Sequence, residues 1–389
     1  MENETLDITK NESTFNFLFG NGESSIIKVI GVGGGGSNTV KHLNELGVKD
    51  VTLIICNTDS IALEKSGMEH KVQIGIETTK GLGCGAKPEI GAKAAEESLD
   101  DIKAILSNNT KMAFITAGMG GGTGTGAAPV IAKAAKDMGI LTVGVVTIPF
   151  EFEMGNKIEM ALRGVQEMKK HVDAMLVVNN ERLIDHYPDE DLSVAFQRVD
   201  DVTANAVKGI TELINIEGYI NVDFADVCTI LRDGGMAVMN TGIGVGERRI
   251  TKAIEDALNS PLLNNQDIRK ARKILFDIHT SKTNQIKPRE IREIKEFMNK
   301  LQFPTEDFIW GATFEDLEDE NSVKITVLAS GFEVNEEDFS GEQKEKVFTI
   351  PDFYNTNKII TPDRKEFDSD EDWINEITNK PAINRKKDN

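Results

Sequence analysis

The chain has 389 residues, of which 39% are hydrophobic and 6% aromatic, and its formal net charge is -20. A chain of this length exceeds one compact core, so we expect two domains with terminal tails. The negative charge argues against a nucleic-acid-binding surface, because phosphates would be repelled. Cys56, Cys84 and Cys228 are widely spaced and form no Cys-x-x-Cys pair. This excludes a disulfide scaffold or a zinc site and fits a reducing cytosol.

The N-terminus is acidic where a secretory signal would be basic and then apolar, since it carries Glu2, Glu4 and Asp7. No apolar run approaches the roughly 20 residues that a membrane-spanning helix needs. We therefore expect a cytoplasmic protein without direct membrane insertion.

Ordered structure is expected to begin at Ile26, after a polar arm over residues 1–25. Residues 26–32 form a short apolar run that predicts a strand, and a glycine-rich stretch follows it. Glycines let the backbone approach an anion, and a helix after them offers unpaired N–H groups. The candidate phosphate-binding residues here are Gly34, Gly35, Gly36, Ser37 and Asn38.

A second glycine loop occupies residues 119–126, between an apolar strand pattern over 112–116 and a helical pattern that starts at Ala127. Its layout of strand, glycine loop and helix is typical of a phosphate site, and its threonines add hydroxyl donors. The candidate ligands of this loop are Gly121, Gly122, Thr123, Gly124, Thr125 and Gly126.

The first loop also fits a dinucleotide fingerprint, because Gly31, Gly33 and Gly36 have its spacing and Asp59 follows the next strand. Against this alternative, a dinucleotide site uses one glycine turn, whereas this chain has two and a further loop at 79–88. The glycine–Gly-Lys-Ser/Thr pattern of P-loop enzymes is absent.

Strand and helix patterns alternate through the first part of the chain. Strands are predicted at 71–76, 112–116, 141–148 and 175–178, and helices at 88–106, 126–138 and 158–169. Continuous apolar strands flanked by helices predict a parallel sheet covered on both faces. Ligands of such a sheet bind at the carboxyl ends of the strands, where the glycine loops lie.

The three loops at 31–38, 79–88 and 119–126 together resemble the FtsZ family of tubulin-type GTPases, and the resemblance extends from about Ile26 to Phe332. It implies an α/β, tubulin-like GTPase domain joined by a long central helix to a smaller α+β domain, with disordered tails. It also implies GTP and GDP as ligands, with Mg²⁺ bound mainly through the phosphates.

The resemblance and the composition together suggest six segments. These are an N-terminal arm (1–25), a GTP-binding domain (26–190), a central helix (191–216), a C-terminal α+β domain (217–332), an acidic disordered linker (333–372) and a partner-docking peptide (373–389).

The loop after residue 148 carries two further candidates, Glu153 and Lys157. In the family the matching loop supplies a Glu and, four residues on, an Arg to the nucleotide. Lys157 is therefore a departure, because lysine keeps the charge but loses the planar bidentate fork. The alternative for Glu153 is a solvated carboxylate in the first turn of a helix.

Apolar residues recur at helical spacing from 192 to 214, which predicts a long buried helix. Near its start, a Phe can stack on a purine and a carboxylate can accept guanine N1–H and the 2-amino group. The resemblance implies that Asp200 binds the guanine with Phe196 beside the ring. Core packing is the alternative for Phe196.

The other end of this helix leads to Asn221, Asp223 and Asp226. Two carboxylates three residues apart can orient a water, but a helix of this length places them on the order of 35 Å from the glycine loops. Spacing alone favours an Asp N-cap with a solvated neighbour. The resemblance implies instead that subunits stack head to tail and that this loop provides the catalytic residues for the next subunit.

The remaining patterns indicate a smaller α+β domain with strands at 236–245, 273–279, 307–314 and 322–330 and helices at 247–258 and 288–301. The polar segment 282–288 departs from the family. From about Glu333 the chain is acidic, and it closes with an apolar stripe at Trp373, Ile374 and Ile377 followed by the peptide Lys380–Lys387. In the family this terminal peptide recruits membrane tethers and regulators; a solvated tail is the alternative.

We therefore expect a cell-division GTPase that polymerises into the cytokinetic ring at mid-cell, with hydrolysis at the subunit contact. Three alternatives stay open: a non-hydrolysing GTP-regulated scaffold, a dinucleotide-binding oxidoreductase, and an adaptor that acts through its tail.

Overall fold

The computed structural model describes residues 25–153, 155–181, 189–216, 218–258, 271–301, 307–315, 317 and 319–332. The predictions for the N-terminal arm, apart from Ser25, and for the linker and the docking peptide lie outside these residues. Within the described part of the chain, none of the helices is both long and apolar enough to cross a membrane.

Six parallel strands form the first part of the sheet, in the order β3-β2-β1-β4-β5-β6. Their apolar side chains are buried on both faces, as the continuous apolar runs predict. The strands are β1 (Ile27–Val32), β2 (Thr52–Asn57), β3 (His70–Gln73), β4 (Met112–Gly118), β5 (Leu141–Ile148) and β6 (Ala174–Asn179).

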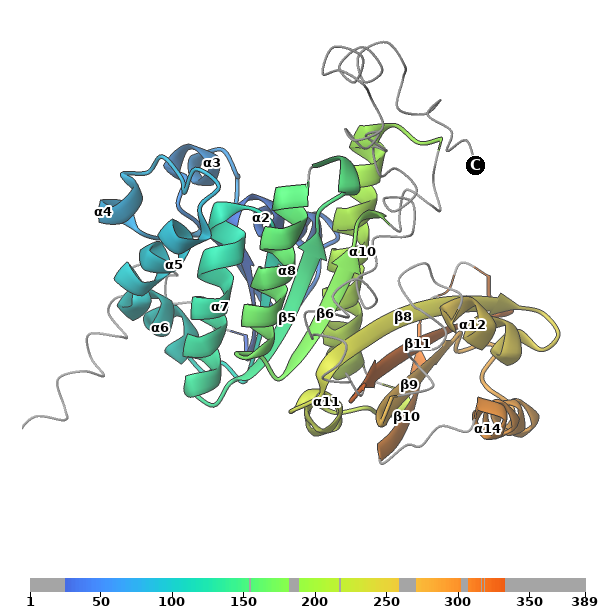
Figure 1. Ribbon diagram of the computed structural model, residues 1–389. Helices are drawn as coiled ribbons and strands as arrows, with labels where there is room; N and C mark the ends of the chain where they lie inside the picture. Colours follow the sequence, from blue (N-terminus) through green and yellow to red (C-terminus); the bar gives the residue numbers. More distant parts are fainter. Residues whose placement is uncertain are drawn as a thin grey trace, which may run out of the picture. The chain divides into compact units, whose positions relative to one another are not determined.

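Helices cover both faces of this sheet (Figure 1). On one face α5 (Pro88–Glu97), α7 (Gly122–Asp137) and α8 (Gly155–Lys169) pack side by side. On the other face α2 (Gly33–Glu45) packs against α10 (Leu192–Asn215). Shorter helical segments are α3 (Ser60–Glu64), α4 (Ile76–Thr79), α6 (Leu99–Ser107) and the 3₁₀ turn η1 (Glu151–Glu153).

Two predicted elements are shortened or split near the contact between Gly75 and Ser98. The predicted helix 88–106 is split into α5 and α6, because Ser98 leaves helical geometry at φ -99° and ψ 22°. Its hydroxyl accepts a hydrogen bond from Gly75 N at 3.0 Å. The predicted strand 71–76 ends at Gln73, because Gly75 turns the chain with a left-handed φ of 65°.

The sheet continues beyond β6 because β6 pairs with β8 over two residue pairs. Five further strands follow, in the order β8-β11-β9-β10-β7. Residues up to Phe332 form one compact unit. The elements of this part are β7 (Gly218–Ile220), α11 (Phe224–Leu231), β8 (Gly235–Val245), α12 (Arg249–Leu258), β9 (Lys273–Thr280), α14 (Pro288–Leu301), β10 (Asp307–Phe314) and β11 (Ser322–Ser330).

Helix α10 connects the two parts of the sheet through one apolar core. Its Ala204, Val207 and Ile210 lie in a single buried cluster with Phe114 of β4 and Leu275 of β9. The 24 residues of α10 span about 36 Å at 1.5 Å per residue. The predicted long central helix is thus confirmed. Its length sets the distance between residues near its start and residues just beyond its end.

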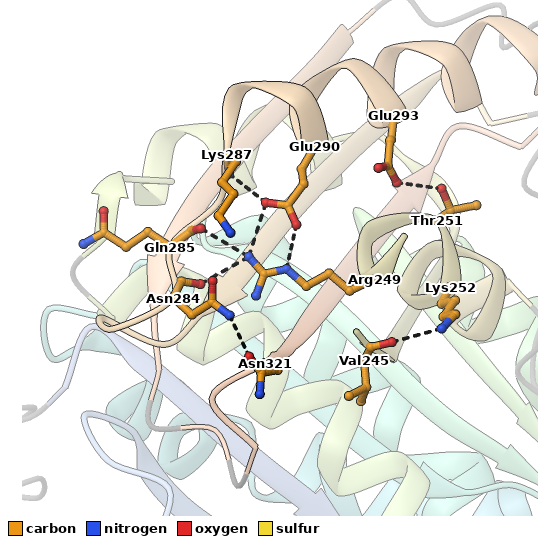
Figure 2. Close-up of polar contacts among 10 residues, drawn as sticks. All are labelled: Val245, Arg249, Thr251, Lys252, Asn284, Gln285, Lys287, Glu290, Glu293 and Asn321. Carbon is orange, nitrogen blue, oxygen red and sulfur yellow. Dashed lines mark hydrogen bonds and ion pairs between the residues drawn. The ribbon is translucent and has the colours of Figure 1, made fainter. Parts of the chain in front are cut away.

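The polar segment before α14 is held by a buried ion pair, which Figure 2 shows. Arg249 is 3% exposed, and its Nε donates to Glu290 Oε1 at 2.7 Å. Its Nη2 donates to the carbonyls of Asn284 and Gln285, each at 3.2 Å. Removing one partner of such a pair typically costs about 3–5 kcal/mol of stability, because the other charge stays buried and unpaired.

Candidate functional site

A cavity of about 450 Å³ lies at the carboxyl ends of β1, β4, β5 and β6. This is the edge where a parallel sheet binds its ligands. The predicted ligands in its wall are Gly34, Gly35, Asn38, Gly121, Gly122, Thr123, Gly124, Glu153, Lys157, Phe196 and Asp200. A larger hollow of about 950 Å³ lies on the outer helical face between α5, α7 and α8, away from these strand ends.

The two glycine stretches are helix N-termini rather than separate loops. Helix α2 begins at Gly33 and α7 at Gly122, both earlier than the sequence predicts. The first N–H groups of a helix have no partner within it and carry partial positive charge. Both helices begin at the cavity, so it has two such N-termini in its wall, which suits a polyphosphate.

The predicted glycines differ in what surrounds them, and four of them show the two extremes. A Cβ on Gly34 or Gly121 would meet no atom within 4 Å, so these backbones face open space in the cavity. A Cβ on Gly36 would lie 2.2 Å from Thr116 O, and one on Gly126 would lie 1.9 Å from Pro88 O. Gly36 and Gly126 therefore allow close packing of the backbone and do not line the cavity.

Two predicted hydroxyls also act within the protein. Ser37 Oγ donates to Gly33 O at 2.6 Å inside the first turns of α2. Thr125 Oγ1 accepts from Gly120 N at 2.9 Å and fixes the turn before α7. Neither Ser37 nor Thr125 lines the cavity at the strand ends, so the structure places both in support of the loops.

Gly34→Ala is expected to fold normally but to weaken GTP binding by about tenfold, roughly the loss of one hydrogen bond to a charged group. The new methyl group would occupy the open space beside Gly34, where the phosphates are predicted to bind. Gly36→Ala is the matched control and should instead lose about 1–3 kcal/mol of unfolding free energy. Fluorescent-nucleotide titration measures the loss of affinity, and urea unfolding measures the loss of stability. Equal effects of both variants on stability would contradict this assignment.

Glu153 and Lys157 form an ion pair at the edge of the cavity. Lys157 Nζ lies 2.6 Å from Glu153 Oε2, and Glu153 Oε1 accepts from Phe150 N at 3.1 Å. A nucleotide phosphate would therefore have to compete with Glu153 for the ammonium group of Lys157. Both side chains line the cavity, so each remains a predicted nucleotide contact.

Phe196 and Asp200 lie on consecutive turns at the start of α10 and both line the cavity. The ring of Phe196 packs edge-on against Phe150, with centroids 4.9 Å apart, and it remains 42% exposed. Burial raises the pKa of Asp200 to about 6. Its neighbour Asp201 lies 2.8 Å from His42 Nε2, whereas no ion pair to Asp200 is found among the described side chains.

Asn180 also lines the cavity, although the sequence analysis does not select it. It is 5% exposed, and its Oδ1 has no hydrogen-bond partner within the described residues. A buried acceptor without a partner is costly, so a ligand donor is the expected occupant. The sequence does contain a signal for Asn180, because the pair Asn179-Asn180 follows directly after the predicted strand 175–178.

Asn221, Asp223 and Asp226 lie at the other end of α10, where α11 begins (Figure 1). Asp223 N donates to Asp226 Oδ2 at 3.0 Å, and Asp226 N donates to Asp223 Oδ1 at 2.9 Å. This reciprocal capping box matches the N-cap alternative for Asp223. Each carboxylate has a second oxygen that these two bonds leave available, so capping and a catalytic role are compatible.

Comparison with known proteins identifies the family. The GTPase domain of the Tubulin/FtsZ family matches residues 26–188, and the FtsZ C-terminal domain matches residues 235–333. The cell division protein FtsZ of Porphyromonas gingivalis is 50% identical over 336 residues, covering 86% of this chain and 71% of that protein. The corresponding protein of Aquifex aeolicus is 44% identical over 326 residues, covering 83% and 87%.

A solved structure agrees with these matches. An empty FtsZ dimer from M. jannaschii has a TM-score of 0.71 at 38% identity and covers 83% of this chain and 92% of its own. The matches confirm the predicted resemblance, fold class and GTPase activity. The matched GTPase domain includes Gly31, Gly33 and Gly36, so their spacing does not mark a dinucleotide-binding oxidoreductase. The chain belongs to the FtsZ family of tubulin-like cell-division GTPases.

Proposed function

We propose that this chain binds GTP in the cavity at the strand ends, stacks head to tail into filaments, and hydrolyses GTP where two subunits meet. The observation that carries the proposal is the placement of the two sets of residues. The cavity lies at the start of α10, and Asp223 and Asp226 lie beyond its end. At about 36 Å they cannot reach a phosphate in their own subunit, but head-to-tail stacking would bring them to the next one.

The roles follow from the local chemistry. Backbone N–H groups at the start of α2 and α7 hold the phosphates, and Asp200 accepts hydrogen bonds from guanine beside Phe196. Asn221, Asp223 and Asp226 position the attacking water, and positioning is a main contribution to phosphoryl transfer. Mg²⁺ would be held mainly by phosphate oxygens and water and would neutralise phosphate charge. Among the described residues, no group of three His, Cys, Asp or Glu side chains forms a separate metal site.

At the cellular level, we infer that the filaments form the cytokinetic ring at the division site. The peptide Lys380–Lys387 would bind membrane-tethering and regulatory division proteins. The support for both statements is the family membership and the sequence of the tail. A chain truncated after residue 372 should assemble normally yet fail to localise to the ring.

The test of the shared active site is phosphate release as a function of protein concentration, with GTP and Mg²⁺, alongside light scattering. Specific activity should vanish below a threshold concentration that coincides with the onset of scattering. Activity strictly proportional to concentration would mean that each chain hydrolyses GTP alone. The assignment of Asp223 and Asp226 would then be wrong.

A further inference from the structure

Three side chains that hydrogen-bond to one another lie behind the cavity, where α7 begins. They are Thr58 in the turn after β2, Cys84 in the loop 79–88, and Thr123 in the first turn of α7. Thr58 is 0% and Cys84 5% exposed. Of the three, Thr123 alone lines the cavity. The loop 79–88, one of the three loops on which the family resemblance rests, therefore meets the site through the hydroxyl of Thr123.

Backbone contacts hold the three segments together around this cluster. Gly83 N donates to Thr58 O at 3.3 Å, and Thr79 Oγ1 donates to the same oxygen at 3.2 Å. A Cβ on Gly122 would lie 2.6 Å from Cys84 Cβ, so the loop also lies close against the start of α7. The loop thus packs both against the turn that carries Thr58 and against α7, which fixes the distances within the cluster.

The distances indicate where the hydroxyl protons go. Thr58 Oγ1 lies 2.8 Å from Thr123 Oγ1 and 3.4 Å from Cys84 Sγ. Thr123 Oγ1 donates to Cys84 Sγ at 3.4 Å. Each hydroxyl has only one proton. Because Thr123 gives its proton to the sulfur, the short contact between the two hydroxyls requires Thr58 to be the donor.

This arrangement leaves the proton of Thr123 on a weak acceptor. Sulfur accepts hydrogen bonds weakly, whereas an ionised phosphate oxygen is a strong acceptor. A phosphate in the cavity would therefore replace the thiol as the acceptor, while Thr58 continues to donate to Thr123 Oγ1. Hydrogen bonds in such a chain strengthen one another, so the bond from Thr58 would strengthen the bond to the phosphate.

We propose that Thr58 is a positioning residue for GTP binding: it donates to Thr123 Oγ1 and thereby directs the proton of Thr123 to a phosphate, and Cys84 accepts that proton when no phosphate is bound. This inference rests on the proposed function, and it adds two residues that do not line the cavity. The two roles predict effects of opposite sign on GTP affinity.

Thr58→Val in the full-length protein keeps the shape of threonine but removes the donor, so GTP binding should weaken by about tenfold. Cys84→Ala keeps the Cβ beside Gly122 but leaves one of the two hydroxyl protons without an acceptor among the described side chains. An unpaired buried donor is costly, so a phosphate that accepts the proton should bind about threefold more tightly. Equilibrium titration with a fluorescent GTP analogue, below the assembly threshold, measures both changes.

A double-mutant cycle shows whether Thr58 acts through Thr123. Thr123→Val alone should weaken GTP binding by about tenfold. Adding Thr58→Val should cost less than about a further twofold, because the donor has no acceptor left to orient. A purely structural Thr58 would instead cost the same factor with or without the hydroxyl of Thr123. Thr58→Ser keeps the donor and should bind GTP nearly as tightly as the wild type.

Thr142→Val is the matched control for the loss of a buried threonine hydroxyl. Thr142 is 0% exposed, and its Oγ1 donates to Ile140 O at 2.9 Å. It lies near the start of β5, at the other end of the strand from the cavity. This variant should lower stability in urea without changing GTP affinity.

The outcomes separate this inference from the proposed function. If Thr123→Val leaves GTP affinity unchanged, the phosphates do not bind at this end of α7, and the proposed site and the inference both fail. If Thr123→Val weakens binding but Thr58→Val does not, or costs the same factor in both backgrounds, the inference alone is overturned. Should Thr58→Val not fold, Cys84→Ala decides, and unchanged or weaker binding overturns the inference.

Discussion

The Asp226→Asn protein is expected to bind GTP and to assemble, but to hydrolyse GTP about 100-fold more slowly or worse. Asparagine has the shape of aspartate, and its side-chain oxygen can still accept the hydrogen bond that Asp223 N donates to residue 226. The capping box therefore survives, while the charge that is proposed to orient the attacking water is lost. Phosphate release and scattering measured above the assembly threshold give turnover per assembled subunit.

A complementation experiment decides whether Asp226 acts on its own subunit or on the next one. Asp200→Ala should bind guanine nucleotide weakly, and Asp226→Asn should bind it but not hydrolyse it. In a mixed filament, GTP held by an Asp226→Asn subunit would meet an intact Asp226 from an Asp200→Ala neighbour. Turnover in the mixture should therefore exceed that of either variant alone, and a simple sum of the two low activities would refute the shared site.

GTP affinity is expected to fall about tenfold between about pH 7 and about pH 5, because the guanine contact proposed for Asp200 requires its ionised form. Burial raises the pKa of this carboxyl from 3.8 to about 6. Above that value it is ionised and, in the proposed site, would accept hydrogen bonds from the guanine N1–H and 2-amino groups. Below about pH 6, the carboxyl group of Asp200 is protonated and must lose its proton before guanine can bind to it. Asp200→Ala should weaken GTP binding by about 100-fold at neutral pH, since hydrogen bonds to a charged acceptor are strong.

The sign of the stability effect distinguishes this loss of affinity from acid unfolding. A carboxyl whose folded pKa is raised contributes stability at low pH and loses that contribution as pH rises through about 6. Asp200 therefore favours the folded protein under the conditions in which it releases GTP. Circular dichroism at each pH would verify that the protein remains folded during the titration.

Two variants control for other titrating groups. Asp200→Asn has no charge to lose, so only the titration of the nucleotide phosphates should remain in its pH profile. Asp201→Asn removes the adjacent carboxylate, which pairs with His42 at 2.8 Å, and should leave the pH profile unchanged. If Asp200→Asn shows the full wild-type dependence, Asp200 is not the guanine acceptor.

Much of the fold follows from local patterns in the sequence. The apolar runs at 112–116 and 141–148 are β4 and β5 of the parallel sheet, because strands covered on both faces cannot contain many polar residues. The helical repeat from 192 is α10, which extends to Asn215. The glycine stretches predict which edge of the sheet carries the cavity. Few other residues allow the backbone to approach an anion so closely.

Tertiary contacts decided which predicted residues face a ligand. Gly34 faces open space whereas Gly36 lies against the backbone of Thr116, and nothing in a run of identical glycines distinguishes them. The hydroxyl of Ser37 satisfies Gly33 O, a partner within its own helix. Asn180 becomes an unpartnered acceptor only because β5 and β6 place it in the cavity wall.

The sequence by itself therefore determined the family, the alternation of strands and helices, and the two stretches of chain that carry the candidate chemistry. Only the tertiary structure decided that Asp277 and His279 of β9 lie beside Glu315 and Lys324 in one cluster of charged side chains. Periodicity reports which face of an element is apolar. It does not report which residues of distant strands meet there, because burial and charge pairing exist only after the strands have packed together.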